Sequence, residues 1–169
     1  YAADVEPAME IRNVTSCLNE IFRKTTALVE ASGCTLEYSS ITEPIYAPVN
    51  TEMLERAVLN ILSNAAKFSP KDSTIRVTLP RRGRSLQLTV LDSGSGIAEN
   101  ILSNVFTRYQ RQPGIEDSRF GLGLGIRMVH SAAQQHGGTL LISRGEEKGT
   151  RVVMTLALRQ KDRMQLSST

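Results

Sequence analysis

An apolar, strand-like segment leads into an acidic residue and two closely spaced glycines in the stretch Leu91-Asp92-Ser93-Gly94-Ser95-Gly96-Ile97. Glycine lets a backbone approach a flat ligand closely, and a carboxylate at a strand end can accept a hydrogen bond from an amine. By itself such a segment is more often only a turn. Asp92 is therefore a candidate amine acceptor whose role depends on the rest of the chain.

A second polar group falls on the helix predicted for residues 51–68. Asn60, Asn64 and Lys67 follow one another there at helical spacing, so they can share one face. Asparagine is a poor residue for a helix interior, which suggests that something else needs these amide oxygens. A magnesium ion with a bound triphosphate would use such an oxygen together with a cation. A polar helix edge that faces solvent explains the pattern equally well.

A glycine-rich segment, Phe120-Gly121-Leu122-Gly123-Leu124-Gly125-Ile126, opens a further predicted helix. Backbone N–H groups at such a helix start can hold an anion, with help from the helix dipole. The glycine spacing is not that of the dinucleotide-binding βαβ unit, and no Gly-Lys-Ser/Thr of a P-loop follows.

Hydrophobic periodicity predicts the elements that position these segments. Helices are expected at residues 15–31 and 51–68 and from about 122 to the Gly137-Gly138 pair; strands are expected at residues 8–14, 34–38, 45–47, 74–79, 86–91, 139–143 and 150–158. Residues 93–120 are expected to form a long functional loop. Strand-rich ends and three long helices predict an α+β fold, a two-layer sandwich with the helices on one face of a mixed sheet.

Composition indicates one ordinary globular domain: of 169 residues, 40% are apolar and 22% are charged, with a net charge of +3. We expect residues 8–158 to form the domain, residues 1–7 to lead into it, and residues 159–169 to be a tail. The start at Tyr1 instead of Met predicts a piece of a longer protein. No apolar run has the length of a membrane span.

Other classes of site are disfavoured. Cys17 and Cys34 are predicted to be reduced, because the chain shows no other secretory signal. No cluster of His, Cys and carboxylate residues has the spacing of a zinc site. The basic run at residues 81–84 is expected to be a solvated hairpin turn, because no aromatic residues are interleaved with it as in a nucleic-acid surface.

Together, the three polar and glycine-rich segments resemble the N, G1 and G2 boxes of the GHKL superfamily, which includes gyrase, heat-shock chaperone, histidine kinase and mismatch-repair ATPases. The resemblance is strongest to the catalytic ATP-binding domain of bacterial sensor histidine kinases. Residues 59–70 resemble its N box, residues 106–111 its F box and residues 149–156 its final strand. The resemblance covers about residues 6–158, and it implies a Bergerat-type fold with about three helices.

The resemblance implies ATP and Mg²⁺ as cofactors. Asp92 would accept the adenine amine, Asn64 would coordinate Mg²⁺, and Arg108 or Arg111 would neutralise charge on the transferring γ-phosphoryl. Residues 106–120 would form a mobile ATP lid. The further nucleotide-binding positions that it implies are Lys67, Phe68, Gly94, Gly96, Ile97, Gly121, Leu122 and Gly123.

Two positions depart from the family pattern. Arg119 stands two places before Gly121, where a glycine is usual, and Arg does not take positive φ freely. Asn60 stands at the catalytic position where the ATP-hydrolysing members keep a Glu. Because an amide cannot act as a general base, this residue favours a kinase over a hydrolase.

The family's phosphoacceptor histidine lies on a separate helical hairpin that precedes this domain. His130 and His136 both fall in or at the end of the last helix, where His130 is expected to be a packed residue instead of a phosphoacceptor. The resemblance thus implies a cytoplasmic domain of a membrane-bound, homodimeric bacterial sensor. Its implied partners are the dimerisation and phosphoacceptor domain of the same protein and a downstream response regulator, without nucleic acid and without membrane contact by these residues. An anti-sigma-factor-type serine kinase and a nucleotide-binding regulatory module without catalysis remain as alternatives.

Overall fold

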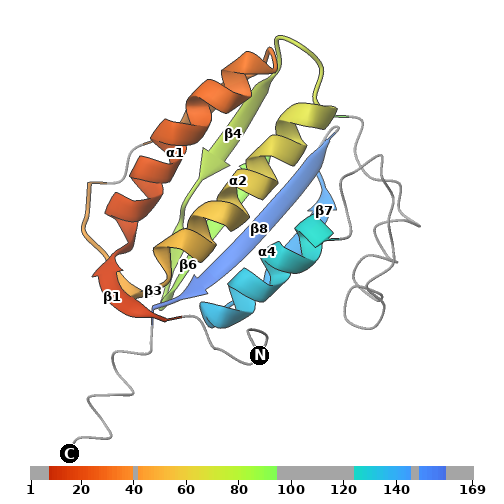
Figure 1. Cartoon of the computed structure of the whole chain (residues 1–169). Coiled ribbons are helices and arrows are strands. Elements are labelled where there is room, and N and C mark those ends of the chain that lie inside the picture. The colour runs from red at the N-terminus through yellow and green to blue at the C-terminus, as the bar shows by residue number, and fades with distance from the viewer. Residues whose placement is uncertain (1–7, 40–41, 95–123, 146–148, 159–169) are drawn as a thin grey trace, which may run out of the picture.

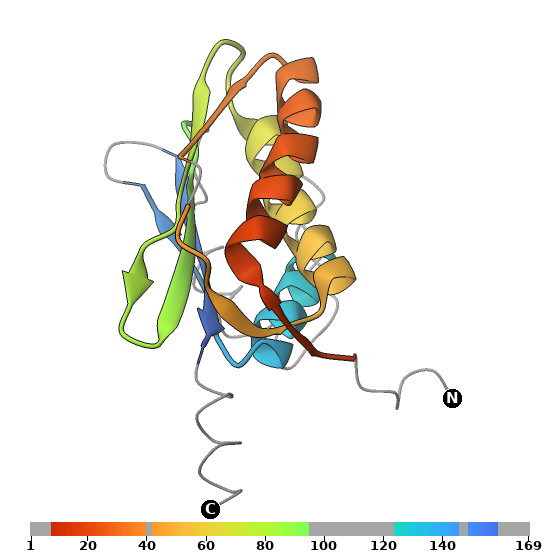
Figure 2. The same ribbon diagram turned by 90° about the vertical axis from the view of Figure 1, so that its left-hand side faces the viewer.

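The computed structural model describes residues 8–39, 42–94, 124–145 and 149–158. One mixed sheet forms one layer, and three helices cover one of its faces as the second layer (Figures 1 and 2). The helices are α1 (Val14–Ala31), α2 (Thr51–Phe68) and α4 (Leu124–Gln135). This arrangement confirms the α+β fold class expected from the sequence.

The strands are β1 (Glu10–Asn13), β2 (Thr35–Tyr38), β3 (Tyr46–Val49), β4 (Thr74–Thr78), β5 (Arg81–Arg82), β6 (Ser85–Leu91), β7 (Leu140–Arg144) and β8 (Thr150–Ala157). The main sheet has the order β2-β4-β6-β8-β7, with β5 added to β6. Only β2 and β4 run parallel; the other neighbours are antiparallel. Strands β1 and β3 form a separate antiparallel ribbon. Because β6 pairs with β8 from Ser85↔Ala157 to Leu91↔Arg151, the end of β6 lies beside the start of β8.

Helix α2 has the bounds that its sequence predicts. The Asn50 side chain caps its start by accepting a hydrogen bond from the Met53 N–H at 2.9 Å. The helix ends at Phe68. Its C-cap residue, Ser69, precedes Pro70, and a residue before proline disfavours helical geometry. The buried stripe that faces the sheet consists of Leu54, Ala57, Val58, Ile61, Leu62, Ala65 and Ala66.

The core lies between this stripe and the inner face of the sheet. In β6 every second residue is buried: Leu86, Leu88 and Val90 are at most 1% exposed. Phe22 and Leu18 from α1 complete the core beside them. Burial of these large apolar side chains is the main force that holds the helix layer on the sheet.

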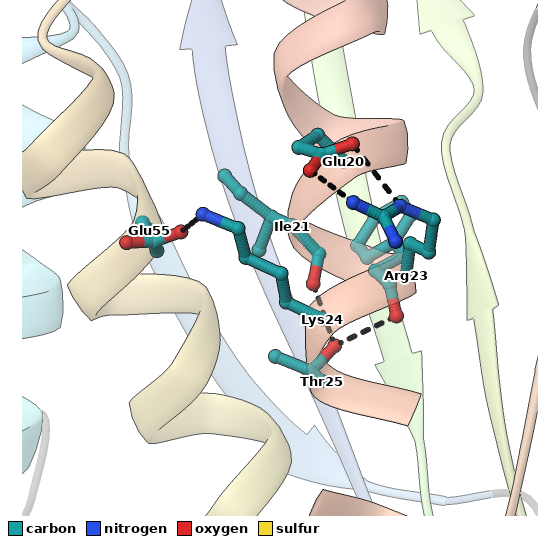
Figure 3. A network of polar contacts seen from close by, with 7 residues as sticks. Glu20, Ile21, Arg23, Lys24, Thr25 and Glu55 are labelled. Atoms are coloured by element: carbon teal, nitrogen blue, oxygen red, sulfur yellow. Dashed lines mark hydrogen bonds and ion pairs between the residues drawn. The ribbon is translucent and has the colours of Figure 1, made fainter. Parts of the chain in front are cut away.

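Polar contacts between α1 and α2 add little to this packing. Figure 3 shows Lys24 of α1 reaching Glu55 of α2, with 3.0 Å between Nζ and Oε1, while Glu20 and Arg23 pair within α1. The Thr25 hydroxyl donates to the backbone carbonyls of Ile21 and Phe22 inside the same helix. Because both ion pairs are largely exposed, they contribute little to the stability of the fold.

The end of α4 is held by a buried histidine. His136 Nδ1 lies 2.7 Å from the Ala132 carbonyl oxygen, and Nε2 accepts a hydrogen bond from the Asn50 N–H at 3.2 Å. Its own carbonyl accepts from the Ala157 N–H at 3.0 Å. One residue thus joins α4, the start of α2 and the end of β8. These contacts require the neutral imidazole with its proton on Nδ1, because a protonated Nε2 could not accept.

Acidification is therefore expected to destabilise the fold through His136. Burial lowers the pKa of His136 below its ordinary value of 6.5, and the Ala132 carbonyl only partly opposes this. Since the unfolded chain binds the proton more readily, this contribution to stability is complete above pH 6.5 and is lost as the pH falls from that value through the lower pKa of the folded state. One proton changes the free energy of unfolding by at most about 1.4 kcal/mol per pH unit.

Urea unfolding at pH 7.5 and pH 5.5 measures this effect. Replacing His136 with Gln, which can both donate and accept, should reduce the difference between the two pH values. The matched variant His130→Gln, at a half-buried position on the same helix, should reduce it less. An unchanged pH difference in the His136 variant would contradict the assignment.

The remaining sequence expectations have simple outcomes. Cys17 and Cys34 are both free thiols, the first half-buried and the second buried. The basic run forms a tight hairpin in which residues 81–82 pair with β6, so it includes a short strand that periodicity did not predict. Among the described residues, no helix is both long and apolar enough to cross a membrane.

Candidate functional site

A pocket that is partly open to solvent lies between the helix layer and the sheet. Helices α2 and α4 form one wall, and the adjacent strands β6, β8 and β7 form the other. Its apolar lining consists of Ile61, Ala65, Val90, Ile126, Val129, Leu140, Ile142 and Val152. An apolar lining with a few polar groups suits a flat, largely apolar ring system.

Predicted site residues from two distant segments meet in this pocket. Asn60, Asn64 and Phe68 come from α2, while Asp92 and Gly94 follow β6. The structure therefore brings together five residues that the sequence analysis had assigned to one nucleotide site. Thr150, at the start of β8, lies in the same pocket.

Asp92 lines the pocket, and its two carboxylate oxygens have different surroundings. Its Oδ1 accepts hydrogen bonds from the Gly94 N–H at 2.9 Å and from the Thr150 N–H at 3.1 Å. No described residue donates to Oδ2, so that oxygen can accept a hydrogen bond from a ligand. Burial raises the pKa of Asp92 above its ordinary value, and the two N–H groups partly offset that rise.

The two asparagines on α2 form a linked pair. Asn64 Nδ2 donates to Asn60 Oδ1 at 3.2 Å, which leaves Asn64 Oδ1 without a donor among the described residues. Gly125 of α4 packs closely against this pair, because a Cβ at that position would lie 2.8 Å from Asn60 Oδ1. The amide of Asn64 is thus oriented with its oxygen free, which is the arrangement that a cation ligand needs.

The end of α2 is in close contact with the loop after β6. A Cβ at Gly94 would lie 2.7 Å from the Phe68 carbonyl oxygen, so glycine permits this approach. Lys67 is exposed, with its Nζ 5.3 Å from the centre of the Phe68 ring. Lys67 does not line the pocket formed by the described residues, so its phosphate contact stays a prediction.

Several predicted site residues lie outside the described part of the chain: Gly96, Ile97, Arg108, Arg111, Gly121, Leu122 and Gly123, together with Arg119 and the predicted lid at residues 106–120. Sequence reasoning, in turn, missed Thr150 and most of the apolar wall. The alternation of apolar residues in residues 139–143 and 150–158 predicted strands, but not that these strands would form the wall of a site.

Comparison with known proteins gives the family. The family model described as "Histidine kinase-, DNA gyrase B-, and HSP90-like ATPase" matches residues 49–160, which is more than half of the chain. The matched region includes every predicted site residue. The comparison also confirms the resemblance to the catalytic domains of sensor histidine kinases, and the relatives found do not favour the anti-sigma-factor-type alternative.

Among curated relatives, sensor protein KdpD of Clostridium acetobutylicum is 37% identical over 57% of this chain and 11% of its own length. Sensor histidine kinase CusS of Escherichia coli is 30% identical over 89% of this chain and 31% of its own length. The chain therefore spans only a small part of these relatives.

Among solved structures, the mycobacterial sensor histidine kinase MprB matches with a TM-score of 0.71 and 26% identity, over 89% of this chain and 97% of that one. The catalytic domain of histidine kinase ThkA matches with a TM-score of 0.74 at 16% identity, over 89% and 95% of the two chains, which shows a shared fold. The fold, the pocket and the matched sequence agree: the chain belongs to the family of histidine kinase-, DNA gyrase B- and HSP90-like ATPases.

Proposed function

We propose that this chain is the ATP-binding catalytic domain of a two-component sensor histidine kinase, in which the ATP γ-phosphoryl passes to a histidine on a separate dimerisation domain. The observation that carries the proposal is the Asp92 carboxylate, which lines an apolar pocket: two backbone N–H groups hold one of its oxygens, and no described residue donates to the other. Family membership and the related sensor kinases support it.

The adenine end of the site follows from this geometry. Asp92 Oδ2 is an acceptor without a hydrogen, so it matches the exocyclic amine of adenine and repels the carbonyl that guanine has at the same ring position. Ile61, Ala65 and Val152 would cover the faces of the base. Phe68 lines the same pocket at the end of α2.

The phosphate end is assigned to the polar residues of α2. Asn64 would offer its free Oδ1 to Mg²⁺, Asn60 holds the Asn64 amide in place, and Lys67 would contact phosphate oxygens. Amide oxygens suit Mg²⁺, which takes oxygen ligands and keeps several from water and phosphate. Bound Mg²⁺·ATP supplies the phosphoryl group. Asn60 cannot take a proton from water, which disfavours hydrolysis and favours transfer to a partner side chain.

The remaining roles depend on residues outside the described part. Arg108 and Arg111 are proposed to neutralise charge on the transferring phosphoryl, and the amides of Gly121 and Gly123 to hold phosphate oxygens. Gly96, Ile97 and Leu122 are proposed to border the nucleotide. These assignments are supported by the motif resemblance.

The proposed partners are the dimerisation domain of the same protein, which carries the phosphoacceptor histidine, and a downstream response regulator. The long curated relatives support a multidomain parent, because this chain covers only 11% of KdpD and 31% of CusS. We place the domain in the cytoplasm, in a homodimeric parent sensor at the membrane. A solved relative in fold is the cytoplasmic segment of histidine kinase QseC.

Asn64→Ala is expected to remove the Mg²⁺ dependence of ATP binding, because the variant lacks the free amide oxygen. Calorimetric titration with ATP, with Mg²⁺ or with EDTA, should show a clear affinity difference in the wild type and little difference in the variant. Ser63→Ala is the matched control, since Ser63 is a half-buried neighbour whose hydroxyl donates to the Asn60 backbone carbonyl. A Mg²⁺ dependence that survives in Asn64→Ala would exclude Asn64 as the metal ligand.

The function as a whole is tested by the same calorimetry on the wild type with Mg²⁺·ATP and a non-hydrolysable analogue. We expect saturable binding of both. No detectable heat with either nucleotide would contradict the proposal and leave only a partner-binding role.

A further inference from the structure

Gly149, which directly precedes β8, packs against Asp92. Gly149 has φ of +89°, and its carbonyl accepts a hydrogen bond from the Gly145 N–H at 3.0 Å. A Cβ at Gly149 would overlap the backbone carbonyl of Asp92 and would lie 3.0 Å from its Oδ1. At the Cα of Gly149, therefore, only a hydrogen atom fits on the side that faces Asp92.

The residue after this glycine holds Asp92 from two sides. The Asp92 N–H donates to the Thr150 carbonyl at 3.1 Å, and the Thr150 N–H donates to Asp92 Oδ1 at 3.1 Å. The backbone and the carboxylate of Asp92 are thus both bonded to a residue 58 positions later in the chain. With the Gly94 N–H also on Oδ1, these contacts leave Oδ2 as the oxygen to which no described residue donates.

We propose that Gly149 is a positioning residue for nucleotide recognition. Because it has no side chain, its backbone can approach Asp92 closely enough for the Thr150 amide to fix the orientation of the carboxylate. Gly149 does not line the pocket, so it acts through Asp92 and not by touching the ligand. This inference rests on the proposed function, in which Asp92 Oδ2 accepts the adenine amine.

Backbone conformation alone does not explain this glycine. Gly83, in the hairpin between β5 and β6, has a similar positive φ of +60°, but nothing lies within 4 Å of a Cβ built there. Both glycines therefore favour the left-handed region, and only Gly149 also contacts Asp92. Comparing substitutions at Gly83 and Gly149 therefore distinguishes the cost of positive φ, which both share, from the loss of the contact with Asp92, which affects Gly149 alone.

The experiment compares two nucleotides in the presence of Mg²⁺: ATP, and purine riboside 5′-triphosphate, which lacks only the exocyclic amine. Calorimetry should show that the wild type prefers ATP by about tenfold or more, as expected for a hydrogen bond to a charged group. In Gly149→Ala and Gly149→Asn the preference should fall towards one. Asn tolerates positive φ, so the second variant keeps the conformation and tests the contact. Gly83→Ala should keep the wild-type preference.

The outcomes are distinguishable. If the Gly149 variants weaken both nucleotides equally and keep the preference, Gly149 has only a structural role and the inference is wrong. If the wild type shows no preference for ATP, the adenine assignment of the proposed function fails instead.

A measurement on the wild type covers the case in which the Gly149 variants do not fold. The Thr150 amide proton, followed by NMR, should shift with the titration of Asp92, and this shift should be absent in Asp92→Asn. A Thr150 amide that does not respond to that titration would overturn the inference without any change at Gly149.

Discussion

Replacing Asp92 with Asn is expected to weaken ATP binding by about tenfold to 150-fold. A hydrogen bond to a charged group contributes about 1.5–3 kcal/mol, and each 1.4 kcal/mol changes affinity tenfold. In the variant, Oδ1 can still accept from the Gly94 and Thr150 N–H groups. The amide nitrogen then occupies the place of Oδ2. The adenine amine, itself a donor, would therefore meet an N–H donor in the variant instead of the carboxylate acceptor of the wild type.

Isothermal titration calorimetry with Mg²⁺·ATP measures this change. The control is Asp72→Asn, which makes the same chemical change at an exposed turn residue with φ of 67°, a conformation that Asn tolerates. We expect the control to bind ATP as the wild type does. Equal affinities of the Asp92 variant and the wild type would show that the adenine assignment is wrong.

Gly138→Ala is expected to destabilise the fold by about 3 kcal/mol, at the upper end of the usual cost of overpacking. A Cβ at Gly138 would overlap the Thr155 carbonyl and lie 3.1 Å from the Leu156 nitrogen. These are backbone atoms of β8, which pairs with both of its neighbours in the sheet and cannot yield as a side chain would. Total stabilities are typically only about 5–15 kcal/mol, so this loss is large.

Thermal denaturation followed by circular dichroism should show the Gly138 variant melting about 6–12 °C below the wild type, on the usual scaling for a chain of this size. Gly83→Ala is the comparison, because it adds a methyl group in open space and costs only the strain of positive φ, about 1–2 kcal/mol. Equal melting temperatures of the two variants would mean that Gly138, between α4 and β7, does not pack tightly against β8.

Local patterns predicted the elements well where the signal was strong. Helix α2 was predicted with its observed bounds because an apolar stripe, a polar start and Pro70 define it within one short segment. The residues of the site were predicted from the motif resemblance, and the structure places five of them in one pocket.

What the sequence did not predict depends on long-range pairing. The sheet order and the β1–β3 ribbon leave no local pattern, because the partners of each strand are chosen by packing across the whole domain. The contact of Gly149 with Asp92 is of the same kind, since it exists only once β8 has paired with β6. Thr150 was missed as a site residue for that reason.

The side chains that line the pocket also belong to the hydrophobic core: Ile61, Ala65, Val90, Ile126, Val129, Leu140 and Ile142. The site is therefore continuous with the hydrophobic core, and a bound base would pack against the same side chains as the core residues do. Occupancy and folding then become one linked equilibrium, in which a nucleotide at a hundred times its Kd would add about 2.7 kcal/mol to stability. A domain built in this way would be most stable against unfolding at high nucleotide concentration, so its lifetime would depend on the concentration of free nucleotide around it.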